Sequence, residues 1–266
     1  MEYVKCDLCG SEKHEPVARQ TDRLHRATEE IFTIVRCVEC GLHYTNPRPT
    51  LAEIGRYYAA GYAFHADAPG WRRRLDRTLD VLAKSPLAGV EVSAAARAAL
   101  TTAGIRCWPN LASVPPEERF GLIRMNWSLE HVHSPREYFS FMARHLSGQG
   151  QAIITVPNYN GLIYRLAPEC VELPVHLYHF RPEDIVAYAN QYGLSVVEAK
   201  TFSYPEMFRA AAEVGLLPPV FPARQSIGVA IAIRDFLKPL DQLGWGNDML
   251  VVLSKSRREN QAGRDA

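Results

Sequence analysis

Apolar residues in the second half of the chain recur in short runs, and helical patterns separate these runs. The strand candidates are "GVEV" (89–92), "GIRCW" (104–108), "FGLIRMNW" (120–127), "QAIITVPN" (151–158), "LSVVEAKTF" (194–202) and "DMLVVLSK" (248–255). Helical patterns follow at 93–103, from "SPRE" onward and at 182–192. Strands that alternate with helices predict a parallel sheet in a three-layered domain. We therefore expect an α/β fold with a Rossmann-like, mostly parallel sheet.

The helix that begins at "SPRE" carries a start signal of its own. Ser134 is in the capping position, Pro135 suits the first turn, and Glu137 completes a capping box. The sequence therefore predicts that Ser134 caps this helix.

The strand candidate "GVEV" ends beside an acid and runs into an alanine-rich helix that Ser93 can cap. This order is typical of the second unit of a nucleotide-binding α/β domain, in which the acid accepts from ribose hydroxyls. Glu91 is that acid here, although an exposed strand end is the alternative interpretation.

The segment before that strand, "RTLDVLAKSP", has no glycine for a phosphate-cradling turn. Only the seven residues 83–89 separate "TLDVL" (78–82) from "VEV". A parallel crossover needs about a dozen residues. The two segments are therefore not expected to form the usual right-handed unit. The "VEV" strand is then expected to pair directly with "FGLIRMNW" or to lie detached from the sheet.

Four of the six cysteines form two matched turns, "CDLCG" (Cys6, Cys9) and "CVECG" (Cys37, Cys40). Each C-x-x-C turn can point two sulfurs at one ion, and the glycine that follows relieves the tight turn. Residues 10–36 between the turns can hold a hairpin. Four sulfur ligands close the coordination sphere, so we expect a structural zinc ion rather than the alternative, a redox dithiol.

Composition and charge narrow the function classes. The net charge of +1 argues against nucleic acid or an anionic membrane as a partner. No apolar run reaches the ~20 residues that cross a bilayer, and "MEYVKCDLC" lacks the layout of a signal peptide. A cytoplasmic protein follows as the expectation. The arginines of "WRRRLDR", from Arg72 to Arg77, fit a solvated helix face better than an RNA surface.

The expected organisation has four parts. Residues 1–50 form the zinc-binding module, 51–86 a helical linker, 87–256 the Rossmann-like domain and 257–266 a flexible tail.

Six segments in this order resemble class I S-adenosylmethionine-dependent methyltransferases with an N-terminal zinc-binding module. They are "CVECGLHYTNPRP", "GVEVSAAARAAL", "FGLIRMNWSLEHVHSP", "GQAIITVPN", "HLYHFRPED" and "DMLVVLSK". The resemblance implies S-adenosylmethionine as cofactor and a small, sugar-like acceptor, for example a nucleotide-linked sugar. It also implies that the first strand and glycine-rich loop of that fold are missing here.

The resemblance further implies roles for individual residues. Glu91 would bind the ribose, Asn110 and Leu111 would lie beside the adenine, and Asn126 would line the pocket. Turn chemistry is the alternative for both asparagines.

A methyl acceptor must lose a proton, and histidine is the usual base near neutral pH. His176 or His179 could serve, and Glu130 and His131 lie where substrate could reach; packing or structural hydrogen bonding is the alternative for all four.

Two functions follow. The first is methyl transfer to a small metabolite, and the alternative is a catalytically inactive relative that serves as a binding or assembly module. A third, RNA modification through the arginine run, fits the near-neutral charge least.

Overall fold

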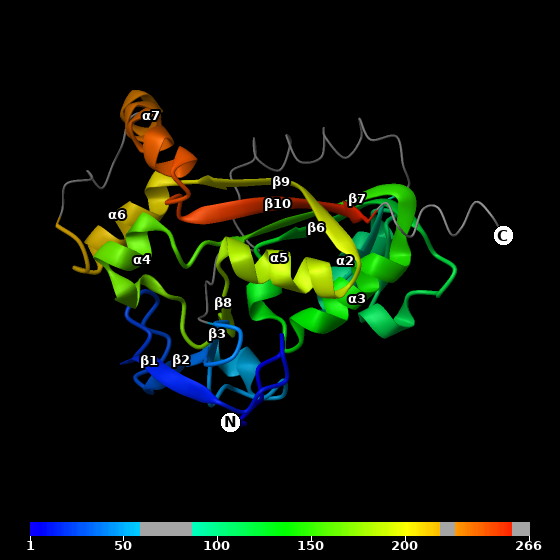
Figure 1. Cartoon of the computed structure of the whole chain (residues 1–266), viewed down its shortest axis with the longest axis horizontal. Helices are drawn as coiled ribbons and strands as arrows, with labels where there is room; N and C mark the ends of the chain where they lie inside the picture. Colours follow the sequence, from blue (N-terminus) through cyan, green and yellow to red (C-terminus); the bar gives the residue numbers. More distant parts are fainter. Residues whose placement is uncertain (59–86, 219–226, 257–266) are drawn as a thin grey trace. The chain divides into compact units, whose positions relative to one another are not determined.

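The computed structural model describes residues 1–58, 87–218 and 227–256 (Figure 1). The chain divides into two compact units, one made of 1–58 with 119–266 and the other of 59–118. The segment "TLDVL", the arginines 72–77, the tail from 257 and most of the expected helical linker lie outside the described residues. Of that linker, the short 3-10 helix η1 (Ile54–Tyr57) is described.

A mixed four-stranded sheet forms the centre of the first unit. Its strand order is β6 (Phe120–Asn126), β7 (Leu146–Pro157), β10 (Asp248–Lys255) and β9 (Leu194–Phe202). Strands β6 and β7 are parallel, whereas β10 is antiparallel to both of its neighbours. The expectation of a mostly parallel sheet is therefore corrected to a mixed one.

The last strand explains this difference. Met249, Val251 and Leu253 are buried on one face of β10, and the strand is hydrogen-bonded along both edges. Its run of apolar residues predicted a buried strand, but such a run carries no information about direction. Because β10 enters between β7 and β9 from the opposite end, the three strands β6, β7 and β9 share one direction and β10 opposes them.

Besides η1, the described helices of this unit are η3 (Leu129–His131), α3 (Pro135–His145), α4 (Leu162–Leu166), η4 (Pro168–Cys170), α5 (Pro182–Gln191), α6 (Pro205–Glu213) and α7 (Ile227–Gln242). Four of them, η3, α3, α5 and α7, contact the mixed sheet, and the other described helices lie in the connections between the strands (Figure 1). Phe139 of α3 stacks on Tyr188 of α5 with ring centroids 4.9 Å apart, and both rings are fully buried.

A second, antiparallel sheet carries the cysteine-rich module. Its order is β1 (His14–Gln20), β2 (Phe32–Cys37), β3 (His43–Thr45) and β8 (Tyr178–His179). The β1–β2 pair confirms the hairpin expected within 10–36. Strand β8 comes from the "HLYHF" segment, so two distant parts of the sequence complete one sheet.

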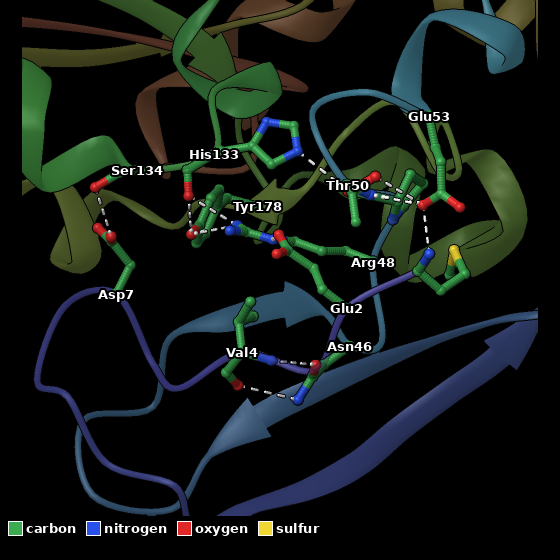
Figure 2. A network of polar contacts seen from close by, with 12 residues as sticks. Glu2, Val4, Asp7, Asn46, Arg48, Thr50, Glu53, His133, Ser134 and Tyr178 are labelled. Carbon is green, nitrogen blue, oxygen red and sulfur yellow. Dashed lines mark hydrogen bonds and ion pairs between the residues drawn. The ribbon is translucent and has the colours of Figure 1, made fainter.

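Asp7, between Cys6 and Cys9, caps helix α3 from across the molecule. Its carboxylate accepts from the backbone N–H of Arg136 (2.9 Å), from Ser134 Oγ (3.0 Å) and from Tyr188 Oη (2.9 Å). The predicted capping box is therefore wrong, because the Ser134 hydroxyl donates to Asp7 and makes no cap bond itself (Figure 2). A full carboxylate near a helix N-terminus also complements the helix dipole.

Arg48 makes the second tie between the module and the rest of this unit. Its guanidinium donates to Glu2 Oε1, to the carbonyl of His133 and to Tyr178 Oη, all at 2.8–2.9 Å. Figure 2 shows the arginine between these partners, and the Tyr178 hydroxyl itself donates to the same carbonyl. The turn that follows β6 is thereby fixed to the N-terminal module.

The described part of the second unit contains a parallel strand pair with an α-helix and a short 3-10 helix. Strands β4 (Ala88–Val90) and β5 (Arg106–Trp108) form a two-stranded sheet of their own; α2 (Ala94–Thr102) follows β4, and η2 (Leu111–Ser113) follows β5. Ser93 caps α2 as predicted, by accepting from the backbone N–H of Ala96. Within this unit, the "VEV" strand is paired with β5.

Replacing Asp7 with alanine removes the acceptor of two hydrogen bonds at the start of α3 and of one from Tyr188 of α5. We expect Asp7→Ala to lower the free energy of unfolding by about 1–3 kcal/mol, since lost caps and unsatisfied buried donors cost this much. Urea unfolding followed by circular dichroism measures it.

The matched control is Glu12→Ala in the same module. Glu12 pairs with Lys5 on the surface, where both side chains are largely exposed, so the urea midpoint is expected to stay unchanged. Equal midpoints for the two variants would show that Asp7 does not hold the helix.

Candidate functional site

Both C-x-x-C turns bring their sulfurs to one point, as the sequence predicts. The four Sγ atoms of Cys6, Cys9, Cys37 and Cys40 lie within 4.8 Å of one another. The closest pairs are Cys6 with Cys40 at 3.4 Å and Cys9 with Cys37 at 3.5 Å. Sulfurs bound to one zinc ion at ~2.3 Å in a tetrahedron stand roughly 3.8 Å apart, so the set fits that ion.

The two turns have the same backbone geometry. The N–H of Gly10 donates to the carbonyl of Cys6, and the N–H of Gly41 donates to that of Cys37. Both glycines have a left-handed φ, 78° and 80°, which side chains rarely adopt. The glycine after each cysteine pair therefore does what the sequence indicated.

Burial raises the pKa of the Cys6 thiol, and it raises the pKa of Cys40 to about 12. Buried thiolates need a nearby cation to stay deprotonated, and a bound zinc ion would be that cation. Four thiolates would complete a tetrahedral coordination sphere, so the donor set fits a structural zinc ion.

A buried polar cluster follows the carboxyl end of β6. The ligand atoms of Glu130, His131 and His176 lie within 4.8 Å of one another. All three residues were candidates from the sequence, and the fold brings them together. Glu130 and His131 belong to η3, and His176 comes from the loop before β8. The two imidazole rings meet edge to face with centroids 4.6 Å apart.

Burial dominates the electrostatics of this cluster. Glu130 is 1% exposed, and burial together with the negative charges of Glu172 and Asp248 raises the pKa of its carboxyl well above the usual value. Burial lowers the pKa of His176, against the opposing effect of Glu172, whose Oε2 lies 3.7 Å from its Nε2. Both groups are therefore held toward their neutral forms.

His179, the fourth candidate, has a defined tautomer. Thr45 Oγ1 donates its only proton to the carbonyl of His176 (3.2 Å). His179 Nε2 lies 3.3 Å from Thr45 Oγ1 and therefore has to donate to that hydroxyl oxygen. The lone pair is then on Nδ1. Burial lowers the pKa of His179 well below the usual value, which keeps the ring neutral.

A small hollow lies beside this ring. Its volume is about 10 Å³, room for about one water molecule, and its lining is Pro157, Tyr159, Tyr164, Val171, His176, Tyr178 and His179. A larger, open hollow of about 630 Å³ lies elsewhere in the first unit, lined by Arg19, Gln20, Thr21, Arg23, Ile31 and Glu169. The larger hollow is thus separate from the catalytic candidates His176 and His179, which line the smaller one.

Trp127 marks the end of β6 with a strained backbone. Its φ is 46°, a left-handed value uncommon for a bulky residue. The indole Nε1 donates to Asp248 Oδ1 (2.8 Å), and the ring packs on Tyr204. Asn126, the predicted pocket residue, is exposed one position earlier.

The remaining cofactor candidates lie in the second unit, at the carboxyl edge of β4 and β5. The N–H of Glu91 donates to the carbonyl of Trp108, and Asn110 with Leu111 follows β5. One carboxylate oxygen of Glu91 accepts from Ser93 N (2.7 Å), whereas Asn110 Oδ1 accepts from Ser113. The Asn110 side chain thus stabilises a turn, which was the alternative interpretation of this residue. It does so at the edge of the sheet where α/β folds bind nucleotides.

Two acids of the site were not among the sequence candidates. Glu172 stands four residues before His176, a spacing in "CVELPVH" that could have drawn attention to it. Asp248 opens the apolar run of β10, where a carboxylate beside a buried strand is itself unusual.

Asp248 makes stability depend on pH. Burial raises its pKa to about 7 from an unfolded value near 4. Because the folded pKa is the higher one, the group's contribution is fully present below pH ~4 and is lost as pH rises through 7. Asn keeps an acceptor for Trp127 and carries no charge.

We therefore expect Asp248→Asn to gain stability over the wild type as pH rises from 4 to 8, by up to roughly 4 kcal/mol. Urea unfolding at several pH values measures the difference. A difference that stays constant across this range would contradict the assignment.

No described helix has both the length and the apolar composition that a membrane span requires.

Comparison with known proteins gives one family match. Residues 78–199 match a family model described as a methyltransferase domain. No curated protein matches the chain.

Solved structures include several similar chains. A SAM-dependent methyltransferase from Archaeoglobus fulgidus is 16% identical, with 68% of this chain and 81% of that one covered at a TM-score of 0.44. One from Mesorhizobium loti is 14% identical, with 64% and 80% covered at 0.43. An O-methyltransferase of a trans-AT PKS multienzyme from Brevibacillus brevis, in complex with S-adenosyl-L-homocysteine, is 14% identical, with 64% and 59% covered at 0.40. By the family match, the chain is methyltransferase-like over residues 78–199.

Proposed function

We propose that this protein transfers a methyl group from S-adenosylmethionine to a small, sugar-like metabolite. The observation that carries the proposal is the methyltransferase-domain match over 78–199, which includes β4 to β7 and the polar cluster after β6. The bound sulfonium supplies an electrophilic methyl group. The protein has to bind the adenosyl part, place the acceptor and take its proton.

Glu91 is the residue we assign to the ribose. Its carboxylate stands at the carboxyl edge of β4, and the bond from Ser93 fixes one of its oxygens. The other oxygen would accept from a ribose hydroxyl. Asn110 and Leu111 at the end of β5 would border the adenine, and Asn126 at the end of β6 would border the pocket.

His179 is the general base in this proposal. Its Nδ1 holds the lone pair, because Nε2 donates to Thr45, and its low pKa keeps it unprotonated at neutral pH. The acceptor's proton would pass to Nδ1 as the methyl group reaches the acceptor atom. His176 is the alternative base, but its ring contacts His131.

The open hollow, which lies apart from His176 and His179, supports the acceptor class that we propose. Arg19 and Arg23 line a space of about 630 Å³ together with Gln20 and Thr21. Two guanidinium groups recognise phosphate oxygens well. A nucleotide-linked sugar is therefore the acceptor that we propose.

Binding of S-adenosylhomocysteine to the full chain tests the cofactor part. We expect Glu91→Gln to weaken the affinity about tenfold or more, because a charge-assisted bond to ribose is lost while an amide oxygen can still accept from Ser93 N. Isothermal titration measures both proteins, and Glu117→Gln, an exposed glutamate of the same unit, should bind as the wild type does. No heat for the wild type at millimolar ligand would leave the chain as an inactive binding module.

His179→Gln tests the base. Glutamine keeps the donor to Thr45 and removes the lone-pair nitrogen, so we expect turnover to fall about 10²–10⁴-fold with unchanged S-adenosylhomocysteine affinity. Label transfer from methyl-labelled S-adenosylmethionine to a panel of nucleoside-diphosphate sugars measures it. The exposed His14→Gln serves as control. Full turnover in the His179 variant would refute its role.

A further inference from the structure

Glu130 poses a physical problem that methyl transfer does not solve. It is 1% exposed, and neither of its carboxylate oxygens accepts a hydrogen bond from any residue that the structure describes. Buried carboxylates without partners are rare, since removing the charge from water costs several kcal/mol. Its side chain therefore calls for a binding partner other than the donors among the described residues.

The neighbours of Glu130 make a cation the fitting partner. The charged groups that act on it most strongly are Glu172 and Asp248, both acidic. Glu172 is also buried, and it lies 3.0 Å from Nε2 of His25 and 3.7 Å from Nε2 of His176. A pocket with several carboxylates favours positive charge.

His131 presents a lone pair toward Glu130. Its Nδ1 lies 2.9 Å from the carbonyl oxygen of Val175, which can only accept, so the proton is on Nδ1. Nε2 then carries the lone pair, and it lies 3.9 Å from Glu130 Oε1. Metal-bound histidines commonly have this arrangement, with the other nitrogen donating to a carbonyl.

His176 completes the set from another segment. Its ligand atom and those of Glu130 and His131 are within 4.8 Å of one another. Atoms bound to a shared ion at ~2.1 Å stand roughly 3–3.5 Å apart, so small side-chain rotations bring them to that distance. Glu172 lies behind His176 as an orienting carboxylate.

We propose that Glu130, His131 and His176 bind a divalent transition-metal ion, separate from the four-cysteine site. Two imidazoles and one carboxylate suit Zn²⁺, Fe²⁺, Co²⁺ or Mn²⁺ and leave coordination positions open. The ion binds whether or not S-adenosylmethionine binds. Any part it has in methyl transfer rests on the proposed function.

Metal content of the full chain tests the site. The protein is stripped with a chelator, reloaded with Zn²⁺ alone, desalted and analysed for zinc per chain. We expect Glu130→Gln to hold one equivalent less than the wild type, with unchanged circular dichroism. Glu137→Gln, an exposed glutamate on α3, should match the wild type. Equal zinc in Glu130→Gln and wild type would overturn the proposal and identify Glu130 as a buried neutral acid.

A spectroscopic measurement on the wild type covers the case in which Glu130→Gln fails to fold. One equivalent of Zn²⁺ is added first to occupy the thiolates, and Co²⁺ is then titrated. We expect visible cobalt bands that saturate at one further equivalent without thiolate-to-metal charge transfer. Absence of such bands, or bands with thiolate character, would refute the site.

Discussion

Buried polar groups have to find partners, and in this protein the partners come from segments far apart in the chain. Asp7 of the first cysteine turn accepts from Ser134, Arg136 and Tyr188. Arg48 donates to the carbonyl of His133. A carboxylate or guanidinium withdrawn from water is stabilised only when all these bonds form together. The cysteine module and the turn after β6 therefore fold as one structure.

This constraint also builds the candidate site. Thr45 of β3 fixes the tautomer of His179 and bonds the carbonyl of His176. The backbone N–H of Leu177 donates to the carbonyl of Glu130, which joins the η3 turn to the loop before β8. A metal ion at the four cysteines would stabilise the module that contacts the segments of Glu130, His176 and His179.

The sequence predicted the elements of this fold better than their connections. Apolar runs located β9 at 194–202 and β10 at 248–255, the bounds that the structure has, because burial on a sheet is a local pattern. The predicted direction of β10 was wrong, because a pattern of apolar residues does not indicate whether a strand runs parallel or antiparallel to its neighbours. The cap of α3 was wrong as well, because Ser134 looks sufficient locally while its true partner, Asp7, is 127 residues away.

In the candidate site, too, local sequence patterns predicted some features, whereas features that depend on distant contacts were missed. Cysteine spacing predicted correctly that the four sulfurs come together, because two C-x-x-C turns leave little geometric freedom. Glu130 and His131 were candidates because they follow a strand, and His176 was a candidate because histidine is the usual base; the fold gathers all three. Glu172 and Asp248 were missed because their importance arises from burial, which depends on packing rather than on neighbours in sequence.

Native-state hydrogen exchange of the full chain, with and without metal at the cysteines, tests most directly whether the module supports the site. If it does, metal removal lowers amide protection in the Cys6–Gly10 turn and equally at Arg136 and Leu177. The N–H of Arg136 donates to Asp7 of the module, and the carbonyl of Leu177 accepts from the N–H of Thr45 in the module. Loss of protection confined to the two cysteine turns, with Arg136 and Leu177 unchanged, would contradict the account.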